Sequence, residues 1–287
     1  MLKSGIQIRW LNTAGFEMIL PGGAHLLVDP WLDSSDIYPI SLDEIERADY
    51  ILLSHIHFDH AQDVGRLLEK FPDARLFVGD LSVDPLCAWQ HISLSNIYRV
   101  HGGEEYTFDD VNIRVFSGRH TESAKGTYRD STVKGDPDSL SYWFGFLELM
   151  NYCITASDGT RILVWAGMTT PDQKYRLQGL KPDLALMHLS PKQNPYMLAD
   201  LVRSIGTQVV IPHHHDLVGP LAAKRPELVE QMLSKEAREA YFADGTFNKE
   251  AFIGYFRSVL QEKVPYIDMM ELEHHKWYKF GLAYEML

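Results

Sequence analysis

The sequence contains little cysteine, a minority of basic residues and no long hydrophobic segment. Its two cysteines, Cys87 and Cys153, are too few for a disulfide scaffold and too far apart for a C-x-x-C metal or redox site. Its 27 basic and 39 acidic residues leave a formal net charge of −12, which argues against nucleic acid or an anionic membrane as the main partner. Because no stretch approaches the roughly 18 apolar residues of a membrane span, and the first residues form no apolar leader, we expect a cytoplasmic protein without membrane insertion.

The remaining composition is that of an ordinary globular chain. With 287 residues, of which 45% are hydrophobic and 23% charged, it can bury a substantial core in one large domain or two small ones. The chain shows no internal repeat and no low-complexity segment. Helical periodicity with mixed charges over 226–242 and 248–263 distinguishes the C-terminal part from the strand-rich remainder.

The most informative feature is a cluster of four metal-capable side chains within six residues: His55, His57, Asp59 and His60. An apolar run directly before it predicts a buried strand, and apolar residues at helical spacing follow it. Alternate residues of an extended segment share one face, so His55 and His57 point the same way, and the coil that follows turns Asp59 and His60 toward a second point. One short turn can therefore serve two adjacent cations, and imidazole with carboxylate suits zinc, iron or manganese.

The motif His-x-His-x-Asp-His after a buried strand resembles the metallo-β-lactamase-fold hydrolases. The similarity extends from residue 5 to about residue 216, and residues 10–16 with 25–31 resemble the opening hairpin of the lactonase-like branch, which includes ascorbate-6-phosphate lactonase. The resemblance implies an α/β fold of the αββα type, in which two sheets lie face to face with helices outside. We expect this metallo-β-lactamase-like domain over 1–224, and a C-terminal helical extension packed on the same domain over 225–287.

The resemblance also implies the ligands of two metal sites. His55, His57 and His120 match the first site, whereas Asp59, His60 and His214 match the second. His120 follows the predicted strand 111–116, and His214 lies two residues after the proline that ends another strand. Asp29 matches a carboxylate that lies behind the ligands and orients them.

One position departs from the family pattern. Met168 stands where the family has an aspartate that bridges the two metals, and a thioether is neutral and soft. Each site keeps three protein ligands, which is enough for a catalytic zinc with one open position. Loss of a negative charge between two dications predicts that one metal binds tightly and the other is labile. Asp172 is either a replacement for the bridge or a helix-capping residue.

The chemistry that follows is hydrolysis by a metal-bound hydroxide, which would cleave an ester, lactone or phosphodiester bond. One or two zinc ions are the expected cofactor, with manganese or iron as alternatives, because zinc lowers the pKa of a bound water from about 15.7 to about 7. Asp59 would orient the attacking water as well as bind metal. For the proton donor to the leaving group we consider His188 first, then His215 and His213, each against a purely structural role.

The substrate is less well defined by the sequence. The resemblance implies a small, anionic metabolite, for which Arg119 and Arg129 are candidate binding residues, although charged loop residues are often only solvated. Residues 121–139 form either a flap over the site or a surface loop, and 271–278 either close over the pocket or mediate homo-oligomer formation. Two other classes stay open: a non-catalytic metal- or ligand-binding member with a degenerate dinuclear site, and an iron-dependent redox enzyme.

Overall fold

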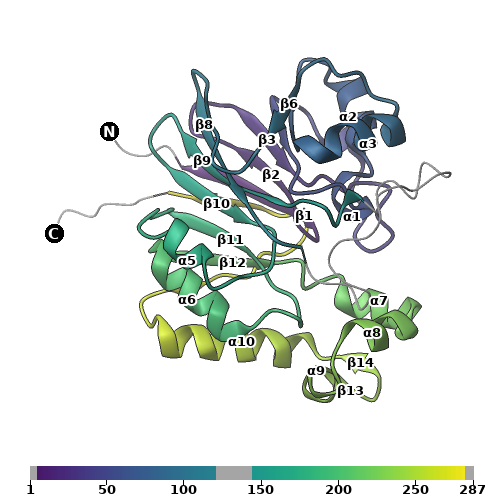
Figure 1. Cartoon of the computed structure of the whole chain (residues 1–287), viewed down its shortest axis with the longest axis vertical. Helices are drawn as coiled ribbons and strands as arrows, with labels where there is room; N and C mark the ends of the chain where they lie inside the picture. Colours follow the sequence, from purple (N-terminus) through teal and green to yellow (C-terminus); the bar gives the residue numbers. More distant parts are fainter. Residues whose placement is uncertain (1–4, 121–143, 282–287) are drawn as a thin grey trace.

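The computed structural model describes residues 5–120 and 144–281, apart from the side chains of residues 228, 231 and 232. Two seven-stranded sheets form its centre (Figure 1). The first has the order β16-β1-β2-β3-β4-β5-β6 and the second has the order β15-β12-β11-β10-β9-β8-β7. In each sheet one half is parallel and the other antiparallel. The strands of the first sheet are β1 (Ile6–Asn12), β2 (Gly15–Ile19), β3 (His25–Val28), β4 (Tyr50–Leu52), β5 (Arg75–Gly79), β6 (Ile97–Val100) and β16 (Trp277–Phe280). Those of the second are β7 (Glu105–Thr107), β8 (Val111–Ser117), β9 (Met150–Ala156), β10 (Arg161–Trp165), β11 (Leu184–His188), β12 (Val209–His213) and β15 (Asp268–Met269).

The sheets pack face to face because their strands carry apolar residues on both faces. In β10, Ile162 and Val164 join the core between the sheets, whereas Leu163 and Trp165 belong to the cluster beneath the helices. This two-residue period is the one expected for a strand that is buried on both sides. A tight turn at Asp158 and Gly159, in which Gly159 has a positive φ, joins β9 to β10.

Helices cover the outer face of each sheet, which completes four layers (Figure 1). The first sheet is covered by α2 (Val64–Lys70) and α3 (Asp80–Gln90), and the second by α5 (Gln173–Arg176), α6 (Pro195–Ile205) and α10 (Lys249–Lys263). The shorter elements are η1 (Leu42–Glu44), α1 (Phe58–Ala61), α7 (Val218–Lys224), α8 (Pro226–Met232), α9 (Lys235–Tyr241), β13 (Phe242–Ala243) and β14 (Thr246–Phe247). The expected αββα sandwich is therefore confirmed. Among the described residues, no helix is both long and apolar enough to span a bilayer.

The C-terminal part differs from the helical extension that the sequence suggests. The periodic segment 226–242 is two helices, because Ser234 starts α9 anew by accepting a hydrogen bond from the backbone N–H of Ala237. Beyond α10, β15 pairs with β12 and β16 pairs with β1, so the last described residues extend both sheets. Strands of two and four residues are too short for a periodic pattern to reveal them.

Candidate metal centre

The candidate ligands come from both sheets and meet at one edge of the sandwich. The turn after β4 supplies His55 and His57, and α1 supplies Asp59 and His60. His120 follows β8 and His214 follows β12. The Nε2 atoms of His60 and His214 lie 3.3 Å apart, although the two residues are 154 positions apart in the chain. The ends of β4 and β12 therefore place ligands of the two sheets side by side, as expected at the carboxyl edge of parallel strands.

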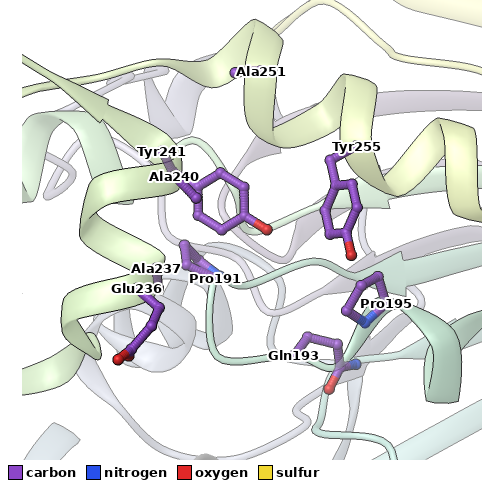
Figure 2. A pocket seen from close by; sticks show the side chains of 9 residues that line it. All are labelled: Pro191, Gln193, Pro195, Glu236, Ala237, Ala240, Tyr241, Ala251 and Tyr255. Carbon is purple, nitrogen blue, oxygen red and sulfur yellow. The ribbon is translucent and has the colours of Figure 1, made fainter.

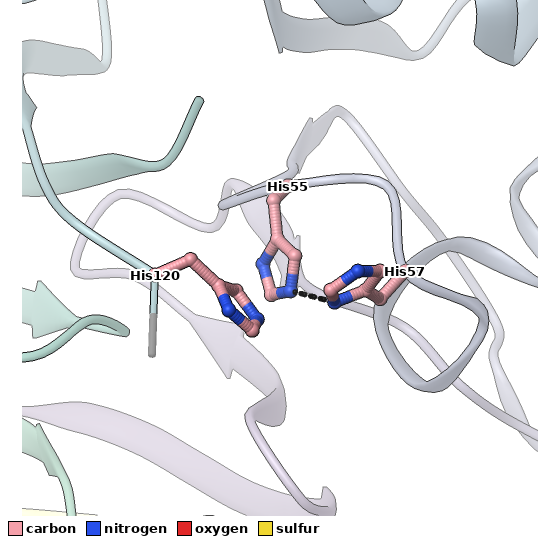
Figure 3. Close-up of side chains that lie close together, drawn as sticks. All are labelled: His55, His57 and His120. Atoms are coloured by element: carbon pink, nitrogen blue, oxygen red, sulfur yellow. Dashed lines mark hydrogen bonds between the residues drawn. The ribbon is translucent and has the colours of Figure 1, made fainter. Parts of the chain in front are cut away.

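The first triad consists of His55, His57 and His120. Its three ligand atoms lie within 4.8 Å of one another, and the rings turn toward a common point from two separate loops (Figure 3). His55 Nε2 is 3.0 Å from His57 Nδ1. The ring of Phe146 packs edge-on against His57 and His120, with centroids 4.5 and 4.7 Å away. Three imidazoles so arranged match the ligand set of a catalytic zinc site with one open position.

The second triad consists of Asp59, His60 and His214. Asp59 Oδ2 lies 3.5 Å from the Nε2 atoms of both histidines. The ring centroids of His55 and His60 are 3.9 Å apart, so this triad adjoins the first. It combines one carboxylate with two imidazoles, a set that suits zinc, manganese or iron.

Asp29 lies behind both triads, fully buried. Its Oδ2 accepts from His60 Nδ1 at 2.9 Å and from the hydroxyl of Ser54 at 2.6 Å, and its Oδ1 accepts from the Ser54 backbone N–H. Because the Ser54 hydroxyl donates to Asp29, its oxygen can accept from His55 Nδ1, 2.9 Å away. One carboxylate thus directs the Nε2 atoms of His55 and His60 outward, the tautomer that a metal ligand needs.

Burial and mutual proximity shift the titration of these groups. Burial, with the nearby histidines, holds the pKa of His55 well below its ordinary value, so its ring is neutral at pH 7. Burial raises the pKa of Asp59, but His60 and His214 outweigh it and keep the pKa below its ordinary value. Burial lowers the pKa of His60, but Asp59 and Asp29 outweigh it and raise the pKa overall. An ionised carboxylate and a neutral first-triad imidazole are the forms that bind metal.

The three candidate proton donors lie in different surroundings. His188 ends β11, and its ring centroid is 4.8 Å from that of His214. His213 is fully buried and its Nε2 lies 3.1 Å from the Trp165 carbonyl oxygen, to which it can donate. His215 is also buried, with its ring against Trp10 at 5.4 Å. Its ring is almost fully enclosed in this structure, and its role as a proton donor stays a prediction.

The remaining predicted site residues lie at the rim or outside the described residues. Arg119 is exposed beside His120, and its carbonyl oxygen accepts from the backbone N–H of Met168 at 2.8 Å. Met168 therefore lies next to the loop that carries His120. Asp172 is exposed and accepts from the Thr170 hydroxyl; it occupies the N-cap position of α5 without a side-chain capping bond. Arg129 and the whole segment 121–139, predicted to be either a flap or a surface loop, lie outside the described residues.

Four residues near the site carry roles that the sequence did not reveal. Ser54 links Asp29 to His55, and Thr13 contacts the backbone of the second triad. Asp216 accepts from the Thr13 backbone N–H at 2.8 Å and from His274 Nε2 at 2.9 Å. Ser54 precedes the predicted ligand His55, and Asp216 lies two positions after the predicted ligand His214, so their place in the sequence is a usable signal. Thr13 and His274 have no such signal.

A cavity of about 570 Å³ lies between α9, α10 and the loop after β11. Figure 2 shows the hydroxyls of Tyr241 and Tyr255 pointing into it, with Gln193 on the opposite wall. Gln193 also exchanges hydrogen bonds with Thr169, which follows Met168 in the loop after β10. No residue of either triad lines this cavity, so it is separate from the candidate metal centre.

Comparisons with known proteins agree with this geometry. Residues 7–143 match the family described as "Beta-lactamase superfamily domain". A protein of Solibacter usitatus named "UPF0173 metal-dependent hydrolase" is 41% identical over 237 residues, which is 80% of this chain and 94% of that protein. Igni18, a metallo hydrolase from Ignicoccus hospitalis, superposes with a TM-score of 0.65 at 14% identity, over 98% of this chain and all of that chain.

The fold alone does not determine the reaction. CmlA, a diiron β-hydroxylase from Streptomyces venezuelae, superposes with a TM-score of 0.62 at 12% identity, over 98% of this chain and 55% of that chain. A diiron β-hydroxylase and hydrolases thus share this architecture, so the family assignment depends on the sequence relatives and not on the fold. By its identity to the Solibacter protein, this chain belongs to the UPF0173 family of metal-dependent hydrolases in the metallo-β-lactamase superfamily.

Proposed function

We propose that this chain is a hydrolase that cleaves an ester, lactone or phosphodiester bond of a small, anionic metabolite with the help of one or two zinc ions. The observation that carries the proposal is the pair of adjacent triads, one of three histidines and one of an aspartate and two histidines. Zinc is preferred because neutral imidazoles dominate the donor set, and manganese or iron are the alternatives.

The metal site, Asp59 and His188 would have separate roles in hydrolysis. A divalent cation held by either triad would supply Lewis acidity and a water molecule of lowered pKa. Asp59, ionised at neutral pH, can accept a hydrogen bond from the attacking water and so orient it. His188 is the candidate donor to the leaving group, because its ring lies beside His214 and it is the least enclosed of the three histidines considered.

The surroundings of the triads suggest how a substrate would be held. The exposed Arg119 beside His120 can attract a phosphate or carboxylate group, and Arg129 stays a prediction. Phe58 lies between two ligands, with 52% of its side chain exposed, and packs edge-on against Trp31. Phe146 packs against the rings of His57 and His120 in the first triad. A substrate with an anionic group and an apolar portion fits both features.

Unequal metal binding is part of the proposal. The first triad contains histidines alone, and Asp59 belongs to the second. Met168 stands at the usual position of the bridging aspartate, so one negative charge is missing between the two cations. The repulsion between the cations is then less compensated, which weakens the binding of the second one. Metal removal and titration with zinc should therefore give two distinct dissociation constants.

Metal analysis and hydrolysis assays test the proposal together. We expect zinc or manganese on protein purified without tags or chelators, and hydrolysis of at least one aryl ester, lactone or bis(p-nitrophenyl) phosphate that His57→Ala abolishes. His91→Ala, at the end of α3, is the control and should keep both metal and activity. Bound iron with optical absorption would favour the redox alternative. Metal-free protein, or metal with no turnover across a broad ester, lactone and phosphodiester panel, would favour the degenerate binder that Met168 suggests.

A further inference from the structure

Thr13, in the turn between β1 and β2, adopts a backbone conformation that its side chain disfavours. Its φ is +38°, in the left-handed region, and the residue is fully buried. A β-branched residue in this region costs of order 1–3 kcal/mol, and such strain persists only where the surroundings impose it. His214 and Asp29, which belong to the candidate metal centre, also have positive φ, at +67° and +41°.

The hydrogen bonds of Thr13 reach two of the three residues of the second triad. Its carbonyl oxygen accepts from the backbone N–H of His214 at 2.9 Å, and its hydroxyl donates to the carbonyl oxygen of Asp59 at 3.1 Å. Thr13 thereby joins the backbone of a ligand from one sheet to that of a ligand from the other. A change in the conformation of Thr13 would move both.

The backbone N–H of Thr13 is held by Asp216, which is held in turn by His274. Thr13 N donates to Asp216 Oδ2 at 2.8 Å, and His274 Nε2 donates to the same oxygen at 2.9 Å. The His274 ring lies between Trp10 and Tyr38, with centroid distances of 3.9 and 3.7 Å and interplanar angles of 23° and 14°. This stacking fixes the ring, and therefore the direction of its N–H.

We propose that His274 and Asp216 are positioning residues for the second triad. They hold Thr13 in its left-handed conformation, and Thr13 sets the backbone of His214 and Asp59 at the spacing that a cation requires. The segment between β15 and β16 is then a structural part of the second metal site. The inference rests on the proposed function, because it assumes that the second triad binds metal.

The first triad is oriented by other residues, so the proposal predicts an effect on the second site alone. His55 is directed by Asp29 through Ser54, and not through Thr13. Loss of the His274 hydrogen bond should therefore weaken the second site and spare the first. Removal of a residue that orients a metal ligand typically lowers affinity by about 10- to 100-fold.

The decisive variant is His274→Phe, which keeps a flat ring between Trp10 and Tyr38 but cannot donate to Asp216. Metal-free wild type and variant are titrated with Zn²⁺ by calorimetry and with Co²⁺ by absorption spectroscopy. We expect the weaker of two sites to lose about 10- to 100-fold in affinity with a changed Co²⁺ spectrum, and the tighter site to be unchanged. Glu271→Gln is the control, since Glu271 lies in the same segment but pairs with Arg257 and Lys249.

A double-mutant cycle separates positioning from simple support of the fold. Glycine adopts the left-handed conformation without strain, so in a Thr13→Gly background His274→Phe should have a smaller effect on the second site. Equal effects in both backgrounds would overturn the proposal. If the melting temperature of metal-free His274→Phe shows that it does not fold, His274→Gln, which keeps a donor, serves in its place and should retain more second-site affinity than His274→Ala.

The outcomes distinguish this inference from the function on which it rests. Two sites in the wild type and the same two affinities in His274→Phe would overturn the inference alone. An equal loss at both sites would also overturn it, because it would point to general destabilisation. A wild type that binds neither metal would overturn the proposed function and the inference with it.

Discussion

The substitution Asp29→Asn tests the orientation of the ligands most directly. Asp29 accepts three hydrogen bonds: from the Ser54 backbone, from the Ser54 hydroxyl and from His60 Nδ1. An asparagine offers one carbonyl oxygen and one NH₂ group in the same space. If the NH₂ group faces His60, the Nδ1 atom must become an acceptor, and the ring proton moves to Nε2, where a metal would bind. If the amide is turned the other way, its NH₂ group opposes the backbone N–H of Ser54.

Either arrangement has a cost that can be estimated. The wrong tautomer of His60 lowers metal affinity by about 10- to 100-fold, which corresponds to about 1.4 to 2.7 kcal/mol. The opposed donors leave a buried N–H without an acceptor, which costs about 1–3 kcal/mol of folding free energy. Because Ser54 carries the effect to His55, we expect both sites to weaken, in contrast to the selective loss in His274→Phe.

The assay is competition for Zn²⁺ with a chromophoric chelator, with urea unfolding of the metal-free protein in parallel. Asp63→Asn is a matched control, since Asp63 is equally buried and accepts from the Leu32 backbone and the Ser34 hydroxyl without contacting a candidate ligand. It should lose stability and keep its metal affinity. Wild-type affinity at both sites in a folded Asp29→Asn protein would refute the tautomer argument.

Two further predictions concern the packing and titration of the site. A Cβ at Gly145 would lie 2.6 Å from Nε2 of His57, so Gly145→Ala should displace that ring and weaken zinc binding at the first site selectively. Zinc titration measures this loss. Gly254→Ala is the control, because its Cβ meets open space and should leave zinc affinity unchanged. Burial lowers the pKa of His215 from 6.5 to about 4, so between these pH values the unfolded chain binds more protons than the folded chain. As the pH falls through this range, the free energy of unfolding of the metal-free protein decreases through this residue by up to about 1.4 kcal/mol per pH unit. His215→Phe removes that loss, so its stability relative to wild type, measured by urea unfolding, should increase from pH 6.5 to pH 4; a constant difference would contradict the assignment of a buried, neutral ring.

The local parts of the site are the ones that the sequence predicts. The strand, turn and helix around His55–His60 are encoded by an apolar run, a polar cluster and helical spacing, all within about 20 residues. The same reasoning places His120 and His214 after strands, and their approach to the first cluster follows from the resemblance to a known family. The structure brings these six residues into the two expected sets of three.

The parts that escaped prediction depend on contacts between distant segments. Thr13 and Asp216 are 203 positions apart, and neither is unusual for its local sequence. β9 begins at Met150 and includes Asn151, because pairing with β8 along its whole length outweighs the low strand preference of asparagine. β15 and β16 form by pairing with β12 and β1 at the edges of the two sheets. A segment of two or four residues is too short to carry a pattern that predicts such pairing.

The two triads are not equivalent, and their surroundings explain why. Burial and neighbouring histidines lower the pKa of His55, so a cation at the first triad does not displace a proton from that ring at neutral pH. Asp59 and Asp29 together raise the pKa of His60, so a cation at the second triad competes with a proton that two carboxylates favour. The same carboxylates attract the cation, however, and Asp29 keeps its hydrogen bond to Nδ1 when Nε2 binds metal. We therefore expect occupancy of the second triad to depend on pH and on the proposed positioning by Thr13, and occupancy of the first to depend less on pH, because burial keeps the His55 ring neutral.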